Sequence, residues 1–231
     1  MTVVFSIIFI IAFYLIIKNF LKVKDNEQSY NQLIEDSIIR DDETQETTID
    51  WDYLKSVNDD IIGWIVIEGT NINYPILQDN SRLYYLKHNY LGNYSSYGSI
   101  FTLDNNAFCR SETSIYGHNM LNGSMFSLLG NYLNRDFLFS HQNIKIYTPE
   151  ANYEGLIFSV YSIGYSQEKE NIYNLSYEEK LEYYINSSKI KIDNINNTEK
   201  ILKLITCSYL NNTTIPTNQR YYIVSMLNEI N

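Results

Sequence analysis

The sequence predicts a mainly β fold, a closed or nearly closed β-barrel with peripheral helices. Two observations support this prediction. Tyrosines, of which the chain has 22, and β-branched residues gather in many short runs, whereas few segments have helical spacing. Gly and Asn turns separate the runs, a pattern typical of small barrels. Hydrophobic residues make up 45% of the 231 residues, so one domain can bury a sizeable core.

The first 23 residues are expected to be a membrane anchor. Residues 2–17 are uncharged, a length near the short limit for a membrane span. No A-x-A-like cleavage site follows them, so an uncleaved anchor is favoured over a signal peptide, and a buried helix is the other alternative. Three lysines follow the apolar run: Lys18, Lys22 and Lys24. The positive-inside rule taken alone would therefore keep the body of the protein in the cytoplasm.

A polar and acidic segment at 24–48 is predicted to form a stalk, partly helical over 30–39. The main domain is expected to occupy 49–231. It should begin with a helix at 50–59, because apolar residues there have helical spacing and the acidic start suits a helix N-terminus.

Short strands are expected to fill most of the main domain. They lie within 61–77, 97–104, 113–118, 143–148, 154–165, 201–207 and 219–226. The first of these segments holds two strands around a turn, for which Gly69 supplies the permissive backbone. Two helices interrupt the strands, at 125–133 and 176–190, with Ser124 and Ser176 as their expected caps.

The net charge of −10 argues against nucleic acid as a partner. Phosphate recognition rests on clustered Lys and Arg, and the sequence has no basic stripe. We also expect no metal and no cofactor.

Two residues near neighbouring strand ends could carry chemistry. Cys207 ends an alternating apolar run, and Arg220 lies near the start of the next one. If the two runs pair as antiparallel strands, Cys207 and Arg220 come to adjacent strand ends, about 4.8 Å apart. From this pairing alone, other interpretations stay open: a buried and inert Cys207, a solvated Arg220, or a disulfide between Cys207 and Cys109.

Among the three histidines, His118 is the strongest candidate for chemistry. It follows a predicted strand and a glycine, at a strand-end loop of the kind where scaffolds present reactive groups. His88 lies among large residues and is expected to be packed or exposed at the surface. His141 is expected in a polar loop.

Several stretches of the main domain match one known family in order. They are "WIVIEGTNINYPILQ", "YYLKHNYLG", "GSIFTLD", "YGHNM" followed by "GSMFSLL", "ITCSY" and "QRYYIV". Over roughly Asp50 to Leu227, the chain thereby resembles the class B sortases, the membrane-anchored cysteine transpeptidases of Gram-positive bacteria. "YGHNM" with the following "SMF" is the most specific single stretch.

The resemblance implies a sortase-like closed barrel with an N-terminal helix and a helix inserted before the cysteine strand. It implies a catalytic trio in which Cys207 is the nucleophile, His118 the general acid and base, and Arg220 a donor to the substrate carbonyl. Four neighbours are expected to contact substrate: Tyr116, Asn119, Thr206 and Ser208. No acidic residue in a motif stands out as the group that orients His118.

The implied reaction cleaves a C-terminal sorting signal of secreted proteins through a thioacyl intermediate on Cys207. An amine of a peptidoglycan precursor then resolves the intermediate, at the extracytoplasmic face of the membrane. Such an enzyme is also classed as a hydrolase and a thiol protease. The alternatives are a pilus-assembling sortase, a general cysteine protease, or a noncatalytic extracellular β-module with a Cys109–Cys207 disulfide.

Overall fold

The computed structural model describes residues 2–40, 47–81, 83–192, 200–210 and 217–230. The chain divides into two compact units, Met1–Tyr53 and Leu54–Asn231. Helix α2 (Trp51–Val57) crosses the boundary between them and confirms the helix predicted at 50–59.

The N-terminal unit consists mainly of one long helix, α1 (Thr2–Ser37). Two short antiparallel strands follow, β1 (Ile38–Arg40) and β2 (Thr47–Ile49). Helix α1 is long and apolar enough to cross a membrane, and its most apolar window has no buried residue. The helix continues unbroken past residue 23, so the predicted boundaries between anchor, stalk and main domain stay predictions.

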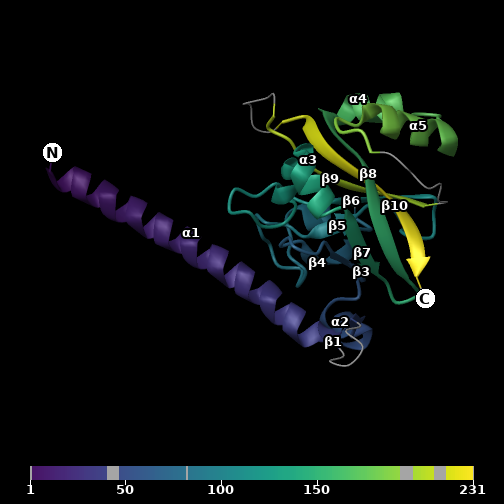
Figure 1. The fold of residues 1–231 in the computed structure, drawn as a ribbon. Helices are drawn as coiled ribbons and strands as arrows, with labels where there is room; N and C mark the ends of the chain where they lie inside the picture. The colour runs from purple at the N-terminus through teal and green to yellow at the C-terminus, as the bar shows by residue number, and fades with distance from the viewer. Residues whose placement is uncertain (1, 41–46, 82, 193–199, 211–216, 231) are drawn as a thin grey trace. The chain divides into compact units, whose positions relative to one another are not determined.

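The second unit is a closed β-barrel, as the sequence predicted (Figure 1). Its strands follow one another around the barrel in the order β10-β8-β7-β3-β4-β5-β6-β9. Their bounds are β3 (Ile61–Val66), β4 (Asn73–Gln78), β5 (Ile100–Thr102), β6 (Glu112–Tyr116), β7 (Asn143–Tyr147), β8 (Asn152–Gly164), β9 (Lys200–Cys207) and β10 (Gln219–Ile230). Strands β4 and β5 pair in parallel, and so do β6 and β9; the other pairs are antiparallel.

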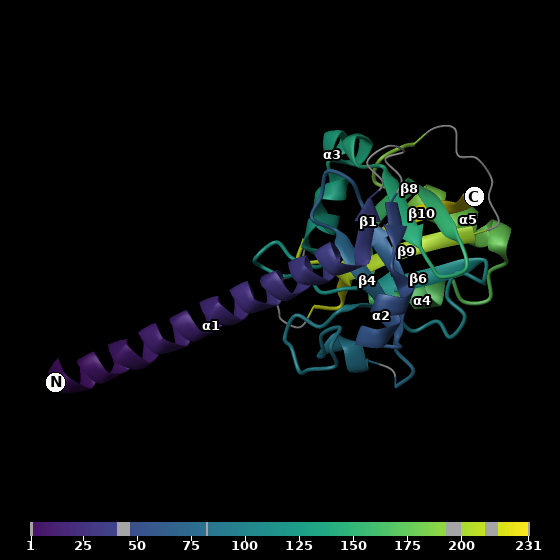
Figure 2. The ribbon, with the colours of Figure 1, turned by 90° about the horizontal axis from the view of Figure 1, so that it is seen from below.

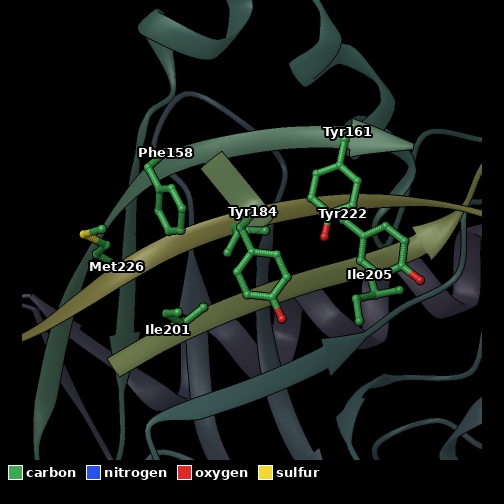
Figure 3. Close-up of a cluster of buried hydrophobic side chains, with 8 residues drawn as sticks. Phe158, Tyr161, Tyr184, Ile201, Ile205, Tyr222 and Met226 are labelled. Atoms are coloured by element: carbon green, nitrogen blue, oxygen red, sulfur yellow. The ribbon is translucent and has the colours of Figure 1, made fainter. Parts of the chain in front are cut away.

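Two helices cover the outer face of β8, β9 and β10: α4 (Tyr165–Asn171) and α5 (Tyr177–Ser187) (Figures 1 and 2). Because strand side chains alternate between faces, one set fills the barrel and the other packs under these helices. Tyr184 of α5 is fully buried there against Ile201, Ile205 and Tyr222, as Figure 3 shows. Burial of such large side chains stabilises the layer by about 2 kcal/mol each.

Helix α5 confirms the predicted inserted helix and its cap. The Ser176 hydroxyl accepts a hydrogen bond from the Glu179 amide, and the Glu179 carboxylate accepts one from the Ser176 amide. This reciprocal capping box satisfies two of the amides left unpaired at a helix start.

An ion pair lies within the same outer layer and ties β6 to β9. Lys203 Nζ lies 2.6 Å from Glu112 Oε1, and the two side chains are only 5% and 18% exposed. Tyr184 donates to the other carboxylate oxygen, and Lys180 lies 3.4 Å from it. Burial alone would raise the pKa of Glu112, but the charges and hydrogen bonds of Lys203 and Lys180 hold it below its ordinary value of 4.5.

The predicted cap at Ser124 was wrong, and two helices were not predicted. The segment after Ser124 forms a 3₁₀ helix, η2 (Ser127–Leu133), preceded by Phe126 and without a side-chain cap. The Ser124 hydroxyl instead donates to Asn122, two residues earlier, because a short polar side chain readily bonds within its own turn.

The segment before His141 is a helix, α3 (Arg135–Ser140), which was not predicted. His141 itself follows the helix. Asn134 caps it by accepting from the amides of Asp136 and Phe137, a start signal present in the sequence. Helix α4 was also not predicted. Its sequence is polar, and its place depends on the buried Glu168, which accepts hydrogen bonds from Tyr161 and Tyr183.

Candidate active site

Cys207 and Arg220 face each other across β9 and β10. The two strands pair antiparallel, and Cys207 lies opposite Arg220 in their register, which confirms the predicted pairing. Cys207 is half-buried, and both it and Cys109 are free thiols. The structure therefore does not contain the disulfide that a noncatalytic module would require.

The Arg220 guanidinium is held by backbone carbonyls at the start of β10. Its Nη1 donates to the carbonyls of Thr217 and Gln219, at 2.6 Å and 2.8 Å. Its central carbon lies 5.9 Å from the centre of the Tyr165 ring, at the start of α4. Arginine carries five donors, so two bonds from one nitrogen leave most of the fork to other acceptors.

The other neighbour of β9 brings His118 to the same end of the barrel. Strand β6 pairs in parallel with β9, with Tyr116 opposite Ile205, and the Gly117 amide continues the ladder by donating to the Ile205 carbonyl. His118 is the next residue along the chain. Two strands that run in parallel end at the same edge, so His118 and Cys207 leave the barrel together.

Hydrogen bonds between β9 and the residues on both sides of His118 hold this segment against the strand that carries Cys207. The Thr206 hydroxyl donates to the Gly117 carbonyl at 2.7 Å, and the Asn119 amide group donates to the Cys207 carbonyl at 2.8 Å. At Gly117 itself, an added Cβ would lie 2.5 Å from a methyl of Ile100 and 2.8 Å from the fully buried ring of Phe126, so this close packing favours glycine.

The His118 ring is oriented by a backbone group that the sequence did not reveal. Its Nε2 lies 2.7 Å from the carbonyl oxygen of Leu86, at the end of the 3₁₀ helix η1 (Tyr84–Leu86). A carbonyl only accepts hydrogen bonds, so Nε2 carries the proton in this contact. A main-chain acceptor has no residue type, and therefore no motif could have predicted it.

The four residues expected to contact substrate all lie at this edge, but most of their polar groups are bonded within the protein. Thr206 is 2% exposed and Ser208 is fully buried. The Ser208 hydroxyl accepts a hydrogen bond from that of Ser162, and the Ser208 amide donates to the Gln219 carbonyl. Their contact with substrate stays a prediction.

Tyr116 is half-buried, and its ring stacks on Phe101 at 5.7 Å between centres. Burial, together with the nearby Tyr165 and Asp104, raises the pKa of its hydroxyl above the ordinary value, so it stays protonated. It can therefore donate a hydrogen bond at any physiological pH.

The two other histidines are occupied elsewhere. His88 stacks on Tyr84 with ring centres 3.8 Å apart, and its Nδ1 lies 2.7 Å from the Tyr84 carbonyl. His141 follows α3, and its Nδ1 lies 2.9 Å from the Phe137 carbonyl. In the part of the chain that the structure describes, no group of three or more His, Cys, Asp or Glu side chains is arranged to hold a metal ion.

Residues 65–228 match the family model described as "Sortase domain". The chain is 46% identical to sortase B of Listeria monocytogenes over 110 residues, which cover 47% of the chain and 45% of that protein. It is 27% identical to sortase B of Staphylococcus aureus over 211 residues, 87% of the chain and 85% of that protein.

Solved structures of similar fold carry the same family name. A Staphylococcus aureus sortase B–substrate complex matches with a TM-score of 0.74 and 25% identity, over 91% of this chain and 100% of that one. Sortase B of Clostridium perfringens matches with a TM-score of 0.68 and 32% identity, over 78% of this chain and 99% of that one. A sortase B complexed with triglycine matches with a TM-score of 0.68 and 28% identity, over 78% of this chain and 86% of that one.

Proposed function

The chain belongs to the sortase family of cysteine transpeptidases, in class B, and we propose that Cys207, His118 and Arg220 carry out the reaction. The observation that carries the proposal is the position of β9 between β6 and β10. Its cysteine ends opposite Arg220 on one side and beside His118 on the other. The three residue types are those that acyl transfer through a thioester requires.

In the first half-reaction, the Cys207 thiolate attacks the carbonyl carbon of the scissile peptide bond. A thioester forms between Cys207 and the acyl part of the sorting signal as the C–N bond breaks. Protonated His118 gives its proton to the leaving nitrogen, which departs as an amine.

In the second half-reaction, an acceptor amine attacks the thioester carbonyl. His118, now neutral, takes the proton that this amine loses, and the C–S bond breaks to restore the Cys207 thiolate. The product is a new amide, so the enzyme returns to its starting state with no net redox change.

Arg220 stabilises the negative charge that develops on the substrate carbonyl oxygen in both steps. Its Nη1 is fixed by the carbonyls of Thr217 and Gln219, so the guanidinium is preorganised. Donors fixed before the reaction need no reorganisation when charge develops, and one such donor is worth about 10²- to 10³-fold in rate.

The substrate is a sorting signal of a secreted protein, and the acceptor is an amine of a peptidoglycan precursor. The substrate and triglycine complexes of similar sortase B structures support a peptide substrate and an amine acceptor. Without an acceptor, water can resolve the thioester, which gives the enzyme its hydrolase and thiol-protease activity. The first 23 residues, in the N-terminal part of helix α1, anchor the chain as a single membrane span. Residues 24–48 act as a stalk, and residues 49–231 form the catalytic domain on the extracytoplasmic face.

Mass spectrometry of the purified chain, mixed with a panel of sorting-signal peptides, tests the proposal. We expect a thioacyl adduct on Cys207 with at least one peptide, and its loss on addition of an amine. Cys109→Ala is the matched control and should form the same adduct. An adduct on neither cysteine with any peptide, or one on Cys109 alone, contradicts the proposed nucleophile. Comparing a peptidoglycan amine with a protein lysine as acceptor separates wall anchoring from pilus assembly.

A further inference from the structure

A backbone carbonyl stands where many acid–base histidines have a carboxylate. The His118 ring is half-buried and is bonded through Nε2 to the Leu86 carbonyl at 2.7 Å. Which nitrogen of a histidine reacts is set by the hydrogen bond that the other nitrogen makes. The position of the Leu86 oxygen therefore matters for the chemistry, although its side chain does not.

A buried carboxylate orders the turn that presents this carbonyl. Asp79 is 2% exposed and accepts hydrogen bonds from three groups: the Ser81 amide and hydroxyl at Oδ1, and the Tyr85 amide at Oδ2. Its own amide donates to Thr102 of β5, so it joins the turn to the barrel. These contacts join Ser81, Tyr85 and β5 through one buried side chain and its amide, so Asp79 holds the start of η1 in place.

Gly98 packs directly against the same carbonyl. It has a φ of +56°, and a Cβ there would lie 2.7 Å from both the Leu86 and Tyr85 oxygens. Neither oxygen belongs to a flexible side chain that could turn away. The next residue, Ser99, donates from its amide to the Tyr85 carbonyl and from its hydroxyl to the His88 carbonyl. Any residue larger than glycine would have to displace the end of η1.

We propose that Gly98 and Asp79 are positioning residues for His118. They hold the Leu86 carbonyl so that Nε2 keeps its proton and Nδ1 is the nitrogen that exchanges protons during the reaction. This inference rests on the acid–base role of His118 proposed above. In the imidazolium form, both nitrogens carry protons. The Nδ1 proton passes to the leaving amine, and the neutral Nδ1 later accepts the proton of the acceptor amine. The other proton stays on Nε2 throughout and is donated in a hydrogen bond to the Leu86 carbonyl.

The ¹⁵N chemical shifts of the His118 ring test this assignment without an activity assay. The full chain is labelled with ¹⁵N-histidine in detergent micelles, and the His118 signals are assigned by their loss in His118→Ala. At a pH where the ring is neutral, we expect a protonated Nε2 and an unprotonated Nδ1. A protonated Nδ1 would overturn the inference.

Gly98→Ala tests the positioning, with Gly92→Ala as its matched control. Gly92 also has a positive φ, of +76°, but a Cβ there meets only the Tyr84 hydroxyl, at an ordinary 3.5 Å. Both variants bear similar backbone strain, and only Gly98→Ala displaces the carbonyl. We expect kcat to fall roughly 10- to 100-fold with KM little changed, by analogy with the loss seen when groups that orient metal-ligating histidines are removed. Equal activity of the two variants would overturn the inference.

A second variant covers the case in which Gly98→Ala does not fold, which far-UV circular dichroism would reveal. Asp79→Asn keeps the size of the side chain but replaces one of its two acceptor oxygens with a donor, so it cannot accept every bond from Ser81 and Tyr85. It should lower kcat in the same way. The exposed Asp136→Asn is its control, and equal kcat for these two variants would also overturn the inference.

Turnover in His118→Ala separates the role of His118 from the role of the Leu86 carbonyl. Parental turnover there contradicts the role of His118 itself, whereas an inactive His118→Ala with a protonated Nδ1 in the parent contradicts only the role of the Leu86 carbonyl.

Discussion

The two neighbours of β9 contribute to the site in different ways. Strand β10 follows β9 along the chain, and the pair brings Arg220 opposite Cys207 through an ordinary antiparallel ladder. Strand β6 comes much earlier in the chain and pairs in parallel, and side-chain bonds support it: Glu112 to Lys203, Thr206 to Gly117 and Asn119 to Cys207. A pair joined by a loop needs little else to stay in register. The parallel pair, which no short loop closes, is reinforced by polar contacts.

Cys207→Ala should have the largest effect, because the residues that β6 and β10 contribute both act on Cys207. The variant should lose all measurable cleavage and transpeptidation while keeping its fold, since a half-buried cysteine at a strand end contributes chemistry more than packing. Peptide turnover followed by mass spectrometry, with circular dichroism for the fold, measures it. Cys109→Ala should retain parental activity. Retained turnover in Cys207→Ala would falsify the role of this strand end.

Arg220→Lys tests the antiparallel neighbour. It keeps the charge but replaces a planar fork with a single ammonium, so it changes geometry more than electrostatics. We expect the acylation rate to fall by about 10²- to 10³-fold. Alkylation of Cys207 by a small neutral reagent should change little, because it develops no oxyanion. Equal slowing of alkylation and cleavage would instead make Arg220 a stabiliser of the thiolate.

Asn119→Ala tests the parallel neighbour at the site itself. Loss of the hydrogen bond to the Cys207 carbonyl should lower kcat about 5-fold and leave KM unchanged. One hydrogen bond contributes about 1 kcal/mol, which corresponds to that change in rate. Asn122→Ala in the same loop is the control, since its side-chain oxygen accepts from the Ser124 amide and hydroxyl, two residues away. A rise in KM at constant kcat would favour the predicted substrate contact of Asn119 over a positioning role.

Glu112→Gln tests the far end of the same strand pair and should change turnover least. It leaves Lys203 buried without its counter-charge, so the free energy of unfolding at pH 7 should fall by about 3 kcal/mol. The folded pKa of Glu112 lies below 4.5, so its stabilising effect is fully present above that pH and is lost as pH falls through the folded pKa. Thermal melts of parent and variant should therefore converge below about pH 4.5.

Glu68→Gln is the control for that measurement. Glu68 pairs with Lys145 at 2.6 Å, but the two side chains are 72% and 35% exposed. An exposed pair is worth less than about 1 kcal/mol, so this variant should melt close to the parent at every pH. Equal effects of the two substitutions would contradict the role of the Glu112–Lys203 pair in joining β6 to β9.

Short-range sequence signals were enough to predict the barrel, its main strands, the capped α5 and the opposition of Cys207 and Arg220. These signals lie within a few residues of one another: alternation along a strand, a serine before an acidic turn, and one loop between two runs. Sequence also carried the start signal of α3 at Asn134, although it was missed. Helix α4 and the 3₁₀ form of η2 lack comparable local signals, because they depend on the elements packed against them.

The orientation of His118, by contrast, follows from tertiary packing alone. The contact joins residues 86 and 118 through a main-chain oxygen, which every residue possesses and no sequence pattern can mark. Likewise, the bonds of Asn119 to Cys207 and of Thr206 to Gly117 cross the parallel pair of β6 and β9. Parallel pairing joins segments far apart along the chain. Its register follows from how the whole barrel closes, so local residue patterns do not specify it.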